Sequence, residues 1–265
     1  VCSGERGPVR GFNIRDHSCI WSSEGQGVVT VLALSQAGSS VLTGDSDGRL
    51  YLLDSRTGRV LRILHPCAVP VTGLAYAPGD SMAACGYADG TVSVFRPGDE
   101  RSTKIFPGRG CPVSSLTFGP AGTELLVLFE RGSPVLLDIV AGAQARTFSG
   151  LSGRAVCSSV SAAGGWFAIG SDDHMLRCWQ WSEPLPATLL PLYRRSVTCC
   201  ATVADGSLLA LGFHDGTIRI CRMPGAVLVR EYRGHKKIVS ACAMTPEGTR
   251  LATASWDGTT RLWRL

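Results

Sequence analysis

A repeat of 42 residues is the feature that most restricts how this chain can fold. Four Asp-Gly pairs share its register, at Asp47-Gly48, Asp89-Gly90, Asp215-Gly216 and Asp257-Gly258. The first two pairs are 42 residues apart, as are the last two, and 126 residues separate the second pair from the third. Arg131-Gly132 and Asp173-His174 occupy the two positions between them, and Arg6-Gly7 lies 41 residues before the first pair. Seven units therefore share one register, which indicates one small structural unit stacked many times.

Each unit is predicted to consist of short β-strands. Runs rich in Val, Leu and Ile alternate with turn signals at intervals of about 8–12 residues, a pattern typical of all-β folds. In the last units we expect an outer strand near 227–232, an inner strand near 238–245, a second near 250–255 and a third near 259–265. No helical period of any length appears. A unit of this length with four strands is a blade of a β-propeller.

The boundaries of the chain leave two blade counts open. The register places the start of the chain inside a second strand and its end after a third, so one blade is divided. A seven-bladed ring needs upstream residues for the first inner strand. In a six-bladed ring, residues 19–22 close the last blade and residues 1–17 lie outside. The Arg6-Gly7 register favours seven blades, and we expect one propeller domain over residues 1–265, excerpted from a longer protein.

Composition favours an ordered protein of the cell interior. Hydrophobic residues make up 45% and charged residues 18% of the chain, and its net charge is +5. The basic residues are spread out, as in solvated loops rather than a nucleic-acid surface. The eleven cysteines form no C-x-x-C pair, which indicates reduced thiols. We expect an intracellular, cytoplasmic location without membrane insertion, with nuclear or cytoskeletal association left open.

The last unit resembles the WD-repeat family. It carries four marks of that family's repeat, at Gly234-His235, Pro246-Glu247-Gly248, Ser255-Trp256-Asp257-Gly258 and Trp263-Arg264. Arg264 departs from the pattern, which has Asp there. The resemblance implies a hydrogen-bonded tetrad, which in this chain is His235, Ser255, Asp257 and Trp263. Because other residue types stand at the His235 position in other units, we expect this blade to be the best hydrogen-bonded and the others to depend on apolar packing.

Motifs that suggest catalysis have structural explanations. His235, Ser255 and Asp257 are the residue types of a hydrolase triad, but the tetrad accounts for all three. Gly44–Gly48 matches G-x-S-x-G, yet that motif requires a strand-to-helix turn, and the same turn recurs elsewhere without Ser. The five histidines form no metal-binding pair. We therefore predict no enzymatic activity, no catalytic residues, no cofactor, no metal and no small-molecule substrate.

The resemblance implies that partners dock on the narrow face that carries the turns before the third strands. The expected contact residues there are Trp256, Ile238, His214, Asp172 and Glu130. Trp256 leads this set because aromatic anchors dominate interface energetics; packing over its own blade edge is the alternative. The predicted function is a non-catalytic scaffold for proteins or peptides in a multiprotein complex. An RNA- or ribonucleoprotein-associated propeller is the other hypothesis, although nucleic acid is not the expected partner.

Overall fold

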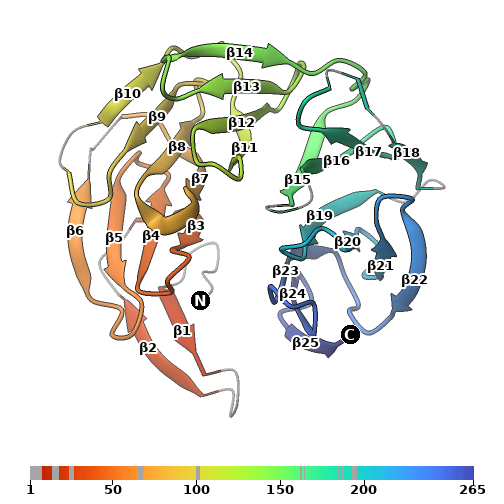
Figure 1. Ribbon diagram of the computed structural model, residues 1–265. Coiled ribbons are helices and arrows are strands. Elements are labelled where there is room, and N and C mark those ends of the chain that lie inside the picture. The colour runs from red at the N-terminus through yellow and green to blue at the C-terminus, as the bar shows by residue number, and fades with distance from the viewer. Residues whose placement is uncertain are drawn as a thin grey trace. The chain divides into compact units, whose positions relative to one another are not determined.

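The computed structural model describes an all-β protein (Figure 1). It covers residues 8–13, 18–23, 27–64, 68–99, 102–161, 163, 165–183, 185–186, 188–192 and 196–265. These residues form 25 strands and a single 3-10 turn, η1 (Pro78–Asp80), at one of the predicted turns. Among them no helix is long and apolar enough to span a membrane. The all-β prediction is therefore confirmed.

Five sheets are complete blades of four strands, and consecutive strands are hydrogen-bonded neighbours in each. The first is β3 (Val29–Leu34), β4 (Ser40–Asp45), β5 (Leu50–Asp54) and β6 (Val60–Leu64). The second is β7 (Val71–Tyr76), β8 (Ala83–Tyr87), β9 (Val92–Phe95) and β10 (Ser102–Phe106). The third is β11 (Val113–Phe118), β12 (Glu124–Phe129), β13 (Val135–Asp138) and β14 (Ala143–Thr147). The fourth is β15 (Ala155–Val160), β16 (Trp166–Ser171), β17 (Met175–Gln180) and β18 (Thr188–Pro191). The fifth is β19 (Val197–Thr202), β20 (Leu208–Phe213), β21 (Ile218–Arg222) and β22 (Val227–Tyr232).

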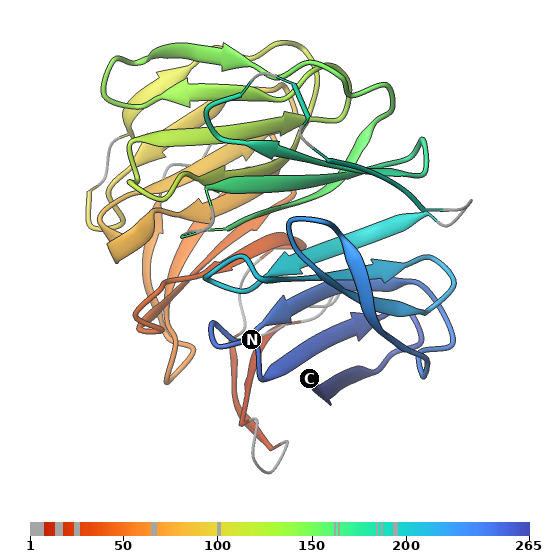
Figure 2. The same ribbon diagram turned by 45° about the vertical axis from the view of Figure 1, so that its right-hand side comes forward.

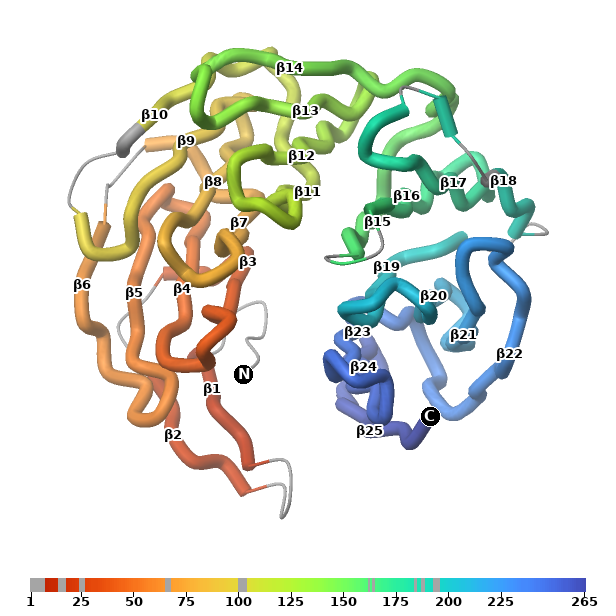
Figure 3. Tube along the Cα trace, in the orientation of Figure 1, coloured from red at the N-terminus to blue at the C-terminus, as the bar shows by residue number. Residues whose placement is uncertain are grey.

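Two sheets are incomplete in the described part of the chain. The last blade has β23 (Val239–Met244), β24 (Arg250–Ser255) and β25 (Thr260–Arg264), which match the strands predicted for it. The first sheet is a hairpin of β1 (Val9–Phe12) and β2 (Cys19–Ser23) (Figure 3). Residues 19–22 thus pair with β1 rather than with the last blade. Six blades with an inner strand are present among the described residues, and the extra hairpin leaves the preference for seven a prediction. Arg6-Gly7 and the expected strand around it lie outside the described residues.

The chain divides into two compact units. The first comprises Val1–Val127 with Leu137–Ala143, and the second comprises Leu128–Leu136 with Gln144–Leu265. Each unit has apolar cores between neighbouring blades. In the second unit, one core includes Trp166, Leu209 and Phe213, and another includes Ile218, Val239 and Leu251. Figure 2 shows these blades, coloured from green to blue, from a second direction.

Glycine allows neighbouring blades to approach each other closely. Four glycines occupy the same register position on the second strands: Gly44, Gly86, Gly170 and Gly212. A Cβ atom on any of them would lie 2.3 to 2.8 Å from the valine that begins the inner strand of the next blade. No side chain fits at such distances, since packed interiors leave no spare volume. The small-residue patch before each turn therefore sets the spacing between blades.

Hydroxyl groups tie adjacent inner strands together at the same level. In the second unit, Thr198 Oγ1 on β19 donates to the carbonyl of Val239 on β23 at 2.5 Å and lies 3.0 Å from the carbonyl of Gly212. In the first unit, Thr30 Oγ1 lies 2.6 Å from the carbonyl of Val71. These bonds fix the inner ends of the blades, from which the turns of the predicted face extend.

Candidate partner-binding face

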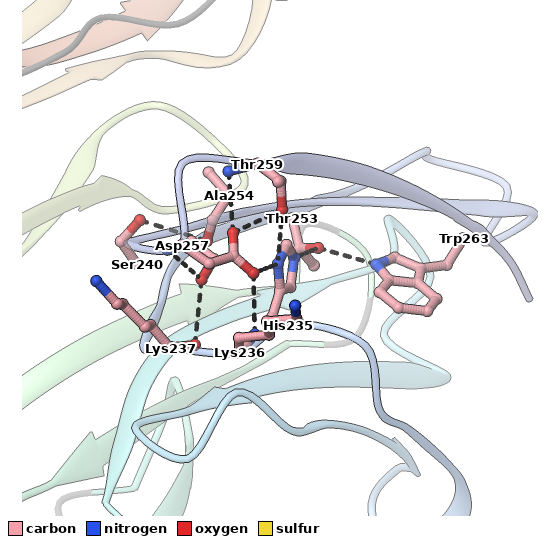
Figure 4. Close-up of polar contacts among 10 residues, drawn as sticks. His235, Lys236, Lys237, Ser240, Thr253, Ala254, Asp257, Thr259 and Trp263 are labelled. Atoms are coloured by element: carbon pink, nitrogen blue, oxygen red, sulfur yellow. Dashed lines mark hydrogen bonds and ion pairs between the residues drawn. The ribbon is translucent and has the colours of Figure 1, made fainter.

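A buried polar network holds the last blade together (Figure 4). The imidazole of His235 lies just before β23, with Nε2 at 2.8 Å from Thr253 Oγ1 on β24. Its other nitrogen, Nδ1, is 3.1 Å from Asp257 Oδ2 in the β24–β25 turn. Trp263 on β25 donates its indole N–H to the same Thr253 hydroxyl at 2.8 Å. The network therefore links both turns and all three strands of this blade.

The hydroxyl of this network belongs to Thr253, so the prediction of Ser255 was wrong. Trp263 pairs with Leu251 across the two strands, which makes Thr253 its diagonal neighbour and places Ser255 two residues farther away. Thr253 and Ser255 lie on the same face of β24 because side chains alternate along a strand. Ser255 instead accepts from the amide of Asp257 at 3.1 Å and donates to the carbonyl of Lys237 at 3.1 Å.

Asp257 is the charged member of the network. The hydroxyl of Thr259 donates to its Oδ1 at 2.6 Å, and the amide of Lys236 donates to its Oδ2 at 2.9 Å. These hydrogen bonds, that of Thr259 first, hold the pKa of the Asp257 carboxyl well below its usual range. Because donors favour the ionised form, Asp257 carries its negative charge inside the turn.

A second polar network, in the β15–β18 blade, corrects the expectation that other blades depend on apolar packing. Arg177 on β17 is 6% exposed, and its Nη2 lies 2.7 Å from Asp173 Oδ2. The same guanidinium donates to Ser171 Oγ and Ser152 Oγ, each at 2.8 Å. Burial alone raises the pKa of Asp173, but the hydrogen bonds from Arg177, Ser171 and Ser152 outweigh it and hold that pKa well below its usual range.

The sequence contained a signal for this network. Asp173 and Asp257 are equivalent in the 42-residue register, and Leu151 stands where the last blade has His235. With no imidazole available, a cation four residues after the turn aspartate is a candidate partner for the carboxylate. Arg177 therefore replaces histidine from the adjacent strand.

A third network lies in the first unit. Asp45 at the end of β4 is fully buried and accepts from the amides of Asp47 at 3.0 Å and Arg49 at 2.7 Å. The Tyr51 hydroxyl is 3.2 Å from its other oxygen. The G-x-S-x-G segment thus joins two strands, β4 and β5, and lacks the strand-to-helix turn of a nucleophile elbow.

The turns before the third strands have a repeated geometry. The amide of Trp256 donates to the carbonyl of Ile238 at 3.0 Å, so the two residues lie side by side. In the preceding blade the amide of His214 donates to Ser196 at 3.0 Å, and one blade earlier Asp172 donates to Arg154 at 3.1 Å. Trp256 is 64% exposed rather than packed over its own blade. His214 and Asp172 are also exposed, and Ile238 is half-buried.

Glu130 and Asp172 share a hollow in the second unit. Its volume is about 480 Å³, and Arg131, Leu151 and Arg154 contribute to its lining. Asp172 Oδ1 accepts from the amide of Arg154 at 2.7 Å, and the guanidinium of Arg154 lies 4.0 Å from Oδ2. The hollow therefore combines both signs of charge, and its two acidic side chains come from neighbouring blades.

The comparisons with known proteins agree with this geometry. The family model "WD domain, G-beta repeat" matches residues 58–96, 142–180, 188–221 and 226–264, more than half of the chain. The chain belongs to the WD-repeat family. The last match, 226–264, contains β22 to β25, so a WD repeat here joins the outer strand of one blade to the first three strands of the next. The predicted WD-repeat β-propeller class is confirmed.

Several curated WD-repeat relatives are similar over part of their length. Human angio-associated migratory cell protein is 29% identical over 114 residues, which cover 36% of this chain and 26% of that protein. Human WD repeat-containing protein 81 is 27% identical over 147 residues, 53% of this chain and 8% of the relative. Guanine nucleotide-binding protein subunit beta-1 of Drosophila melanogaster is 27% identical over 136 residues, 50% and 40% of the two chains. The chain thus matches well under half of each relative's length.

The thiols of this WD-repeat chain are poorly suited to nucleophilic chemistry. The nine cysteines in the described residues are free. Burial raises the pKa of Cys178 to about 12, so its thiol stays protonated at neutral pH. Within the described ranges, no group of three or more His, Cys, Asp and Glu side chains is placed to hold a metal ion.

Proposed function

We propose that this chain is a non-catalytic scaffold that binds proteins or peptides through the face formed by Trp256, Ile238, His214, Asp172 and Glu130. The observation that carries the proposal is the exposure of Trp256, 64%, on a turn whose backbone is hydrogen-bonded to the neighbouring Ile238. A large aromatic side chain on a rigid turn loses little conformational entropy on binding. Family membership supports the same role, as do free thiols for an intracellular location.

The polar networks also favour binding over catalysis. His235 and Asp257 have the residue types of a catalytic pair, but both are engaged in the fold: His235 with Thr253, and Asp257 with Thr259 and the amide of Lys236. A general base must reach a substrate proton in a cleft. The His235 side chain is fully buried, so the pair supports the turn that presents Trp256.

The test is affinity purification of the chain from cell lysate with quantitative mass spectrometry, comparing wild type with Trp256→Ala. Val227→Ala is the matched control, because Val227 is 60% exposed on β22, away from this turn. We expect Trp256→Ala to deplete a set of proteins at least about tenfold with an unchanged melting temperature, while Val227→Ala retains them.

Two other outcomes would contradict the proposal. Retention of every captured protein by Trp256→Ala would exclude this face as the docking site. Captured material that disappears after ribonuclease treatment would instead support the RNA-associated hypothesis, since nucleic acid would then hold the assembly together.

A further inference from the structure

Lysine is scarce in this chain and concentrated beside Trp256. The sequence has three lysines, Lys104, Lys236 and Lys237, against 26 basic residues in all. Lys236 and Lys237 are consecutive and exposed, and they lie between His235 and Ile238. Figure 4 shows the side chain of Lys237 extending away from the polar network. Two flexible cations thus stand next to the largest exposed aromatic residue of the described chain.

Hydrogen bonds fix the backbone of this lysine pair to the turn that carries Trp256. The amide of Lys236 donates to Asp257 at 2.9 Å, and the carbonyl of Lys237 accepts from Ser255 at 3.1 Å. The carbonyl of Ile238 accepts from the amide of Trp256 at 3.0 Å. Residues 236–238 and 255–257 therefore form one rigid platform, which we call the lysine–tryptophan platform.

The exposed charge of the platform is positive. Asp257 is its one acidic residue, with a side chain only 8% exposed that accepts from Lys236 and Thr259 inside the turn. The ammonium groups of Lys236 and Lys237 are thus the charges that a partner meets first. Beside them, the indole of Trp256 and the half-buried Ile238 provide apolar surface.

We propose, on the basis of the scaffold function above, that the lysine–tryptophan platform binds an acidic peptide segment that carries an apolar anchor. The anchor packs on Trp256 and Ile238, while carboxylates on either side pair with Lys236 and Lys237. Charge complementarity selects this class of partner, because like charges across an interface are unfavourable. Nucleic acid fits less well, since two cations contact few phosphates.

A defined peptide tests the platform directly. The probe is a fluorescein-labelled 12-residue peptide with a central Leu flanked by Glu residues, titrated against the full chain by fluorescence anisotropy. Two matched probes replace Glu by Lys, or Leu by Ser. We expect the Glu–Leu peptide to bind and both matched probes to bind at least about tenfold more weakly.

Variants separate the two parts of the platform. Trp256→Ala should weaken the Glu–Leu peptide by about 30-fold, the effect of losing an interface hot spot. Lys236→Glu with Lys237→Glu should weaken it by about tenfold, since each exposed ion pair contributes about two- to fivefold, and should improve binding of the Lys peptide. Lys104→Glu, the same charge change in the first unit, is the control and should leave binding unchanged.

The three lysines also provide an internal footprint. Reductive methylation with and without the Glu–Leu peptide, followed by mass spectrometry, should show protection of Lys236 and Lys237 but not Lys104. Equal binding of the Glu and Lys peptides, or equal methylation of all three lysines, would overturn the proposal. Tighter binding of an oligouridylate RNA, lost in the lysine variant, would overturn it in favour of nucleic acid. If Trp256→Ala loses cellular partners while the lysine variant keeps them, the scaffold function stands and the acidic-peptide inference fails.

Discussion

Thr253→Val tests the polar network of the last blade. The substitution keeps the shape of the side chain and removes the hydroxyl that Trp263 and His235 share, each at 2.8 Å. A buried polar group left without its partner costs about 1–3 kcal/mol. The His235 side chain is fully buried and pays this cost in full, whereas the half-buried Trp263 recovers part of it from water. We therefore expect a loss of about 2–4 kcal/mol in the free energy of unfolding.

The assay is denaturant unfolding, supported by thermal melts. At about 2–4 °C per kcal/mol for a chain of this size, the melting temperature should fall by about 4–16 °C. Exchange of the Trp263 indole proton, followed by NMR, gives a local measure and should become much faster. Ser255→Ala is the comparison and should cost about 1 kcal/mol, because Ser255 makes its bonds at the surface of the turn. A larger loss for Ser255→Ala than for Thr253→Val would refute the assignment of Thr253 to the network.

Three further predictions concern packing, charge and pH. Gly212→Val should destabilise the chain by about 1–3 kcal/mol, because its Cβ would lie 2.8 Å from Val239; Val239→Ala in the same chain should recover part of the loss in urea unfolding. Arg177→Met should cost about 2–4 kcal/mol by leaving Asp173 partly buried without its cation, and the added Asp173→Asn change should restore most of it, unless the ion pair is unimportant. Asp173 and Asp257 have lowered pKa values, so their stabilisation is complete above the unfolded value near 3.9 and is lost as pH falls below it; Asn at either position should flatten the acid limb of a stability-against-pH curve.

The strands of the last blade were predictable to within about one residue. The predicted runs 238–245 and 250–255 became β23 (Val239–Met244) and β24 (Arg250–Ser255). Turn residues with positive φ, such as Gly248 and Gly258, end these strands sharply, and a glycine in such a turn is visible in the sequence. The 42-residue register then carried the same boundaries to weaker blades.

The membership of the polar networks was less predictable. Thr253 and Ser255 are both hydroxyl residues on one face of β24, so the sequence pattern alone does not distinguish them. The choice depends on cross-strand register, which places Trp263 opposite Leu251 and therefore diagonal to Thr253. Arg177 was missed for a related reason, because its guanidinium lies in an otherwise apolar strand and its partners come from two different turns.

The network of the last blade and its exposed face are one mechanical device. Trp256 lies between Ser255 and Asp257, whose side chains bond to the main chain at Lys237 and Lys236. The same Asp257 holds His235, which contacts Thr253 and through it Trp263. A buried network that is satisfied at each step is rigid. Because this rigidity reaches the turn, the exposed indole is held in place before any partner arrives, so binding has less ordering entropy to overcome.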